Sequence, residues 1–262
     1  MALHPVPAAP PNPAIRRKIT AVASGKGGVG KTWFAITLSH ALGRGGQRTL
    51  LFDGDLGLAN VDIQLGLMPE NDLAGVIAGK LTLPQAITRY EEGQFDILAG
   101  RSGTGKLATL PTQRLVTLRD SLMQLAAQYD RVLLDLSAGV DRTVQTLAAA
   151  AGTVLVVTTD EPTSLTDAYA FIKLTLADHP DADLRIVVNM ADSQNAGRET
   201  YETLRKACQN FLGRELPLAG VIRSDSHVRD SIRRQVGLLT RHPSSDAAAD
   251  IEAVADRLKR VA

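Results

Sequence analysis

The sequence contains a single cysteine, Cys208, so one chain can form no disulfide and no cysteine-built metal or iron–sulfur site. It also lacks eighteen consecutive apolar residues and an N-terminal signal peptide, which argues against a spanning helix and against export. Neither sign of charge is in excess: 29 Lys and Arg residues stand against 28 Asp and Glu residues. The overall charge therefore does not indicate nucleic acid or an anionic membrane as a partner. These absences favour a cytoplasmic protein, with peripheral attachment at the inner face of the cell membrane as the alternative.

The remaining composition is typical of a globular protein. With 262 residues, of which 44% are hydrophobic, the chain is long enough for one well-buried α/β domain. Five prolines fall within residues 1–13, where no continuous apolar stretch occurs. We therefore expect residues 1–17 to be a disordered lead-in and residues 18–262 to form a single domain.

Short β-branched or aliphatic runs alternate with segments of helical spacing. Because the runs are apolar on both faces, they predict buried parallel strands, with the helical segments covering the sheet. The pattern predicts a doubly wound, mostly parallel sheet of about seven to eight strands, with helices on both faces and a ligand site at the carboxyl ends of the strands. The runs are residues 19–24, 49–53, 95–98, 131–135, 154–158, 185–189 and 218–222.

A glycine-rich loop follows the first predicted strand and precedes a predicted helix. It satisfies the Gly-x-x-x-x-Gly-Lys-Ser/Thr pattern of a phosphate-binding loop, and this context favours ATP·Mg²⁺ binding over an ordinary turn, which needs neither the lysine nor the hydroxyl. Its backbone N–H groups would face the phosphates, Lys31 would add a charge, and Thr32 would offer a hydroxyl to Mg²⁺. The loop consists of Gly25, Lys26, Gly27, Gly28, Val29, Gly30, Lys31 and Thr32.

A second glycine-rich stretch, residues 100–106, also fits the first part of this pattern. Leu107 replaces the metal-binding hydroxyl there. We therefore interpret this stretch as a connection after the third predicted strand and not as a second phosphate site.

Aspartates end two of the predicted strands. Asp53 ends the run 49–53, Asp55 lies two residues further on, and Asp135 ends the run 131–135. Carboxylates buried beside a phosphate loop need a cation, so we expect Mg²⁺ to be held by Thr32, Asp53, Asp55 and Asp135. Asp135 suits the Walker B role, and Asp55 suits orienting the attacking water. The alternative for each aspartate is a helix cap or a turn.

These residues together resemble the deviant-Walker ATPases of the MinD/ParA class. The specific features are Lys26 inside the phosphate loop, the sequence Asp53-Gly54-Asp55, and the stretch 135–139. The resemblance implies an ATP-dependent homodimer in which Lys26 reaches the partner's nucleotide, with Lys26, Lys31 and Asp55 as catalytic residues. It further implies that ATP is hydrolysed to ADP slowly without a partner, that Asn189 contacts the adenine, and that Glu161 lies near Lys26.

Within this class, residues 57–67 and 161–169 are similar to the FlhG (FleN) regulators of flagellar number and placement. That likeness implies flagellar partners such as an FlhF-like GTPase and switch-complex proteins. A ParA-like DNA or cargo partitioning ATPase and a MinD-like division-site regulator are the alternatives. Two departures stand out: Trp33, a candidate nucleotide contact or packing residue, replaces a small polar residue, and residues 1–17 lack the glutamine-bearing segment that stimulates FlhF.

The carboxyl-terminal part raises two further questions. Residues 246–262 have helical spacing of apolar residues but no large aromatic ones, so we expect this helix to pack on the sheet and any membrane association to be weak. A basic stretch lies between residues 223 and 241, where a solvated helix face is favoured over nonspecific DNA binding. Its arginines are Arg223, Arg229, Arg233, Arg234 and Arg241.

Overall fold

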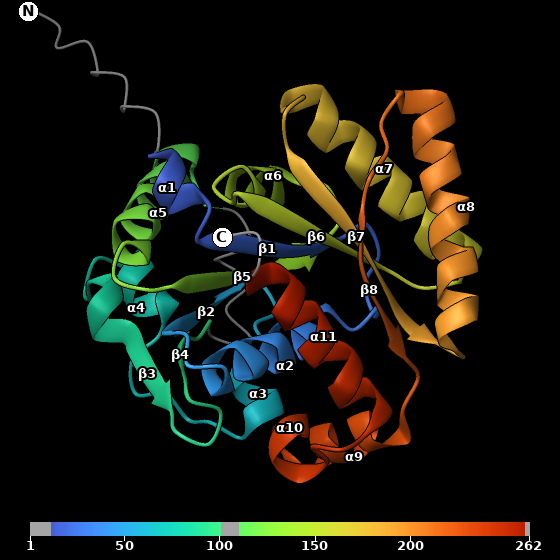
Figure 1. Ribbon diagram of the computed structural model, residues 1–262. Helices are drawn as coiled ribbons and strands as arrows, with labels where there is room; N and C mark the ends of the chain where they lie inside the picture. Colours follow the sequence, from blue (N-terminus) through green and yellow to red (C-terminus); the bar gives the residue numbers. More distant parts are fainter. Residues whose placement is uncertain (1–11, 101–109, 260–262) are drawn as a thin grey trace, which may run out of the picture.

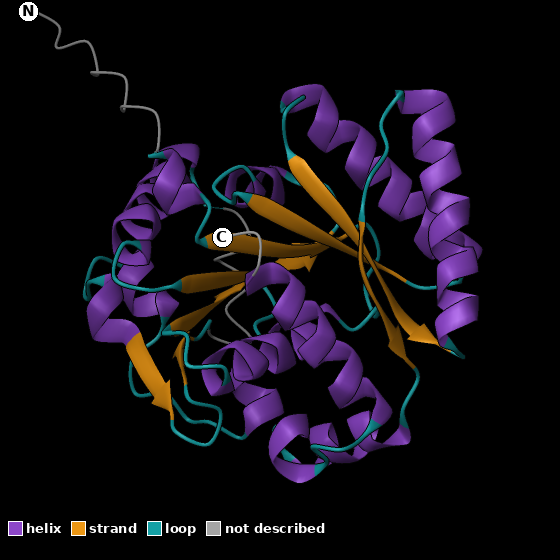
Figure 2. Ribbon diagram, viewed as in Figure 1, coloured by secondary structure: helices purple, strands orange, loops and turns teal. Residues whose placement is uncertain are grey.

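The computed structural model describes residues 12–100 and 110–259 and is built around a sheet of eight strands (Figures 1 and 2). The strand order is β3-β4-β2-β5-β1-β6-β7-β8, and all neighbours are parallel except the antiparallel pair β3 and β4. The strands are β1 (Ile19–Ser24), β2 (Thr49–Gly54), β3 (Ile87–Tyr90), β4 (Phe95–Leu98), β5 (Arg131–Ala138), β6 (Thr153–Thr158), β7 (Asp183–Ala191) and β8 (Leu218–Arg223).

All seven strands predicted from the sequence are confirmed, two with the expected bounds and five that are one to four residues longer. The antiparallel edge strand β3 was not predicted. It is only four residues long, contains Arg89, and buries only Tyr90 fully, so it lacks the apolar run that marks the inner strands.

Helices cover both faces of the sheet (Figure 1). One core cluster joins the sheet to α5 (Thr112–Ala126), α6 (Arg142–Ala148), α7 (Pro162–Asp178) and α8 (Gln194–Leu212). The other joins it to α2 (Lys31–Arg44), α3 (Val61–Leu65), α9 (Ser226–Arg234), α10 (Leu238–Arg241) and α11 (Asp246–Lys259). The remaining elements are α1 (Pro13–Arg16), α4 (Leu73–Ile77) and the 3₁₀ helix η1 (Leu83–Ala86). The predicted doubly wound fold is therefore confirmed.

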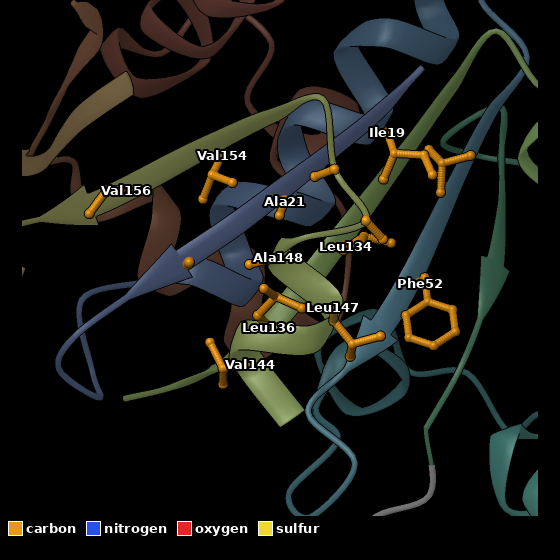
Figure 3. Close-up of a cluster of buried hydrophobic side chains, with 14 of the residues drawn as sticks. Ile19, Ala21, Phe52, Leu134, Leu136, Val144, Leu147, Ala148, Val154 and Val156 are labelled. Atoms are coloured by element: carbon orange, nitrogen blue, oxygen red, sulfur yellow. The ribbon is translucent and has the colours of Figure 1, made fainter. Parts of the chain in front are cut away.

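Clusters of buried apolar side chains pack on both sides of the centre of the sheet. Figure 3 shows one cluster, in which Phe52, Leu134 and Val154 from three strands lie with Leu147 of α6. Phe52 has no exposed surface, so its replacement by alanine would cost about 3–5 kcal/mol of folding free energy. This core holds the strand ends that carry the candidate site in fixed register.

The structure bears on three expectations about the chain ends and loops. The described part of the expected lead-in contains a short helix, α1, which contacts α5. The second glycine-rich stretch lies, apart from Gly100, outside the described residues. Helix α11 buries Ile251, Val254, Ala255 and Leu258 and packs on β8 and α2, as predicted. None of the helices described is long and apolar enough to cross a membrane.

Candidate active site

The phosphate loop opens into a cavity of about 820 Å³ at the carboxyl ends of the strands. Of the predicted site residues, the cavity is lined by Gly27, Gly28, Gly30, Lys31, Thr32, Trp33 and Asp55. The segment 56–64, the end of β5, Asp141, Met190 and Ile232 complete its wall. The volume lies within the range of small-molecule sites. The other predicted site residues do not line this cavity: Gly25, Lys26, Val29, Asp53, Asp135, Glu161 and Asn189.

The backbone of the phosphate loop requires glycine at defined positions. Gly28 and Gly30 have φ angles of 82° and 87°, which side chains rarely adopt, and Gly30 is the N-cap of α2. A Cβ on Gly30 would lie 2.4 Å from Nδ2 of Asn189. The loop therefore ends at a helix N-terminus whose free N–H groups face the cavity side of the sheet, the arrangement that binds phosphate.

Lys31 and Thr32, the first residues of α2, lie near the buried Asp135 of β5. Lys31 is 8% exposed, and its Nζ donates to Oγ of Ser24 at 2.8 Å. Burial lowers the pKa of Lys31, while Asp135 and Asp55 oppose that shift. Thr32 is hydrogen-bonded to Asp135, whose Oδ1 is buried without a partner among the described residues. Burial raises the pKa of Asp135, so this carboxylate would be stabilised by a cation.

Asp53 and Asp55 organise the segment that follows β2. Asp53 is fully buried, and its carboxylate accepts hydrogen bonds from the backbone N–H groups of Asp55, Asn60 and Val61 at 3.1–3.2 Å. Burial, and then the neighbouring Asp135, raise the pKa of Asp53. Asp55 accepts from the N–H of Leu58 at 2.9 Å and lines the cavity. The structure thus places Asp55 in the cavity and Asp53 behind it.

Lys26 does not line the cavity in this structure. Its Nζ forms an ion pair with Oε2 of Glu161 and donates to Oγ1 of Thr163 at 2.7 Å. Glu161 is the N-cap residue of α7, and Thr163 lies in its first turn. The expected proximity of Glu161 to Lys26 is therefore present in the geometry, within one chain.

Trp33 lies in α2, directly after the loop, and Asn189 lies in β7. Trp33 is 6% exposed and packs in the core cluster of α2, and its Nε1 finds no hydrogen-bond partner in the described part of the chain. Asn189 is buried and donates its amide to the carbonyl of Val29 at 2.8 Å, so it supports the loop from behind. The next residue, Met190, is half exposed and lines the cavity instead.

Sequence reasoning did not select several residues that shape the site. Ser24 binds Lys31, Thr163 binds Lys26, and Asp141 caps α6 at the cavity wall. Ser24 directly precedes the loop, and Asp141 begins an Asp-x-Thr capping pattern, so both left a signal in the sequence. Thr163 lies two residues after Glu161, which was expected near Lys26, but no pattern marked Thr163 itself.

The residues present fit a nucleoside triphosphate with Mg²⁺. The glycine cradle and Lys31 supply N–H donors and a charge, and Thr32 with the unpartnered Oδ1 of Asp135 supplies oxygen ligands. Among the residues described, no three His, Cys, Asp or Glu side chains gather into a metal site of their own. That agrees with Mg²⁺ sites in which few protein ligands are completed by phosphates and water.

A parallel sheet with a glycine cradle, a buried lysine and a strand-end aspartate defines a P-loop ATPase. The model of the CobQ/CobB/MinD/ParA nucleotide-binding domain matches residues 20–238, and the chain belongs to this family. It is 38% identical to the antiactivator FleN of Pseudomonas aeruginosa, over 92% of this chain and 86% of FleN. It is 30% identical to the flagellum site-determining protein YlxH of Helicobacter pylori, over 92% of this chain and 81% of YlxH.

A solved structure agrees with the fold and with the kind of ligand. The septum site-determining protein MinD of Pyrococcus horikoshii, complexed with Mg-ADP, superposes with a TM-score of 0.78 at 25% identity, over 93% of this chain and 96% of that one. The resemblance to the MinD/ParA class is confirmed.

Proposed function

We propose that this chain is an ATP-dependent dimerising switch that regulates the number or placement of flagella. The observation that carries the proposal is the position of Lys26, which is held outside its own cavity in an ion pair with Glu161. A lysine in that position is available for exchange to a second molecule. The similarity to FleN and YlxH supports the flagellar part of the proposal.

The roles of the cavity residues follow from their contacts. Lys31 would bind the phosphates, and Thr32 and Asp135 would hold Mg²⁺. When bound, Mg²⁺ neutralises the charge that develops on the transferred phosphoryl group. Asp55 lines the cavity opposite the loop and would orient the attacking water. Asn189 and Trp33 would position the nucleoside end, the first through Val29 and the second as part of the wall.

Dimerisation would couple to nucleotide through Lys26. Two ATP molecules facing each other across an interface repel one another, so a cation supplied from the opposite chain stabilises the pair. ATP would then favour the dimer because Lys26 binds more strongly there than to Glu161, and hydrolysis would remove that preference. The ADP state would return to the monomer described above.

Light scattering tests the dimer directly. We expect monomers with ADP, dimers for Asp55→Ala with ATP, and monomers for Lys26→Ala with ATP. Monomers in all three samples, with ATP binding demonstrated by calorimetry, would remove the dimer from the proposal and leave a monomeric ATPase.

Expression in a P. aeruginosa strain without FleN tests the flagellar role. The wild-type chain should restore the flagellar number of the parent strain, and Lys31→Ala should not. If neither chain changes flagellar number although both are produced, the flagellar assignment is wrong. MinD-like division-site control would then be examined by cell length in the same strains.

DNA partitioning has less support from the surface. Most of the basic stretch is already neutralised: Arg223 pairs with Asp246 and Asp250, and Arg234 and Arg241 pair with Asp230. Clustered free cations are needed to bind duplex DNA, so we do not propose it. Flagellar partners, including an FlhF-like GTPase and switch-complex proteins, are the ones we would test first.

A further inference from the structure

A second hollow, of about 410 Å³, lies at the amino ends of the central strands, whereas the phosphate loop lies at their carboxyl ends. Arg131, Thr153 and Asp183, the first residues of β5, β6 and β7, line it together with Arg17 and Arg185. The phosphate loop follows the far end of β1, so about 20 Å of strand separates the two sites. The hollow is therefore independent of the nucleotide cavity.

Arg131 is buried in this hollow and forms no ion pair with a carboxylate of residues 12–100 or 110–259. It is 6% exposed, and its Nη1 and Nη2 donate to the carbonyls of Arg17 and Leu258 at 3.3 and 2.6 Å. Its Nε has no partner among the described residues. Burial and the nearby Arg185 lower the pKa of Arg131. A buried cation that is bonded only to neutral carbonyls is costly, and an anion would offset that cost.

The side chains that line the hollow carry more positive than negative charge. Arg185 donates through Nε and Nη2 to the two oxygens of Asp183 at 3.0 and 2.7 Å, and Thr153 donates to the same carboxylate at 2.9 Å. Arg17 is exposed and has no ion pair in the part of the chain that the structure describes. Three guanidinium groups therefore share one carboxylate, in a chain whose net charge is only +1.

Neighbouring cations add to this local excess. Arg16 donates to the carbonyl of Ala151 at 3.0 Å, and Lys18 donates to that of Tyr129 at 2.8 Å. Asp130 is the nearby carboxylate outside the hollow, and it accepts from the backbone N–H of Arg48 at 2.9 Å. Cations from several elements therefore gather at the amino ends of the strands, and most of them bind backbone carbonyls.

We propose that this hollow is a second anion site, which binds the phosphate group of a small molecule. Guanidinium groups match phosphate oxygens through paired hydrogen bonds, and the hollow is large enough for a small ligand around that group. A phosphate here would stand against Arg131 and Arg185 and reduce the repulsion between them. Arg17, at the exposed side, would close on the ligand.

Calorimetric titration of inorganic phosphate into the full-length Lys31→Ala protein, at constant ionic strength, tests the site. The Lys31→Ala substitution is included so that the phosphate loop does not bind the added phosphate. We expect saturable binding to one site. Arg17→Gln should weaken it about tenfold or more, since hydrogen bonds to charged groups are among the strong ones. Arg48→Gln is the matched control, because Arg48 lies at the same end of the sheet over the ring of Tyr129 but does not line the hollow.

Asp183→Asn separates binding from a structural role. Removing the one carboxylate frees Arg185, so phosphate should bind several-fold more tightly, whereas a purely structural cluster would show no gain. Circular dichroism of each variant confirms folding.

Phosphate on a lipid is the alternative source of the same group. If vesicles of phosphatidylglycerol bind wild type but not Arg17→Gln, the phosphate group belongs to a lipid. If they bind neither protein, the phosphate group belongs to a soluble small molecule. Heat that does not saturate, or that is unchanged in both Arg17→Gln and Arg185→Gln, would overturn the proposal. Binding that appears only after removal of residues 260–262 would also overturn it, because that segment would then be the occupant.

Discussion

Lys26 of the phosphate loop is paired with Glu161 at the start of α7, two residues 135 positions apart in the chain. Their side chains are 35% and 61% exposed, so water screens the pair and it contributes about 1 kcal/mol or less. A weak, solvent-accessible pair is well suited to a lysine that must change partners. It holds Lys26 in place without making its release expensive.

Replacing Glu161 tests this arrangement. Glu161→Gln should shift the ATP-dependent dimer equilibrium of the Asp55→Ala protein toward dimer by up to about fivefold, because Lys26 no longer leaves a charged partner. Light scattering over a range of protein concentrations measures the shift. Glu202→Gln, which breaks the exposed pair with Arg205 on α8, is the control and should change nothing. A weaker dimer in Glu161→Gln would mean that Glu161 supports the interface.

Asp55 should be required for hydrolysis and not for binding. Its carboxylate reaches the cavity while accepting from Leu58, so Asp55→Ala should reduce phosphate release by about 10²–10⁴-fold and keep nucleotide affinity within a few-fold. Phosphate release and calorimetry measure the two quantities. Asp62→Ala, on the neighbouring helix α3, should hydrolyse normally. A normal rate in Asp55→Ala would exclude this role.

Trp33 should report nucleotide binding by fluorescence. It is the only tryptophan of the chain, it lines the cavity, and its Nε1 has no partner in the described structure. Adding ATP·Mg²⁺ should change its emission in wild type, and Lys31→Ala should remove the change together with binding. Unchanged emission in wild type, with binding seen by calorimetry, would place the nucleotide away from the indole.

The sequence was sufficient for the inner sheet and the phosphate loop because both depend on local patterns. Strands buried on both faces are largely apolar, as β1 and β6 are, and the glycines of the loop are required by their φ angles. Edge strand β3 escaped prediction because a half-exposed strand of four residues has no such pattern.

Side-chain orientation at the site could not be read in the same way. Asp53 and Asp55 are two residues apart and were both assigned to Mg²⁺, yet the loop after β2 folds back and covers Asp53 with three of its own N–H groups. The pairing of Lys26 with Glu161 was implied by a family resemblance, and Thr163 was not anticipated at all. Contacts made across the fold therefore needed the structure.

His40 should make the fold sensitive to mild acid. It lies in α2 near the ring of Phe95 and is 2% exposed, and its pKa is lowered to about 4 by burial and then by Arg44, against an ordinary value of 6.5. The unfolded chain therefore takes up a proton below pH 6.5 that the folded chain refuses. The stability that neutral His40 provides is present above that pH and is lost as the pH falls toward 4.

Denaturant unfolding of wild type and His40→Gln at pH 7 and at pH 4.5 measures this effect. At pH 7 the variant should be less stable, because the packing of the imidazole is lost. The difference in unfolding free energy should then move in favour of the variant by up to about 3 kcal/mol on acidification, since its side chain does not titrate. His179→Gln, which removes an exposed histidine at the end of α7, is the control for the loss of a histidine as such. An equal pH response in wild type and His40→Gln would show that other groups, and not His40, govern acid unfolding.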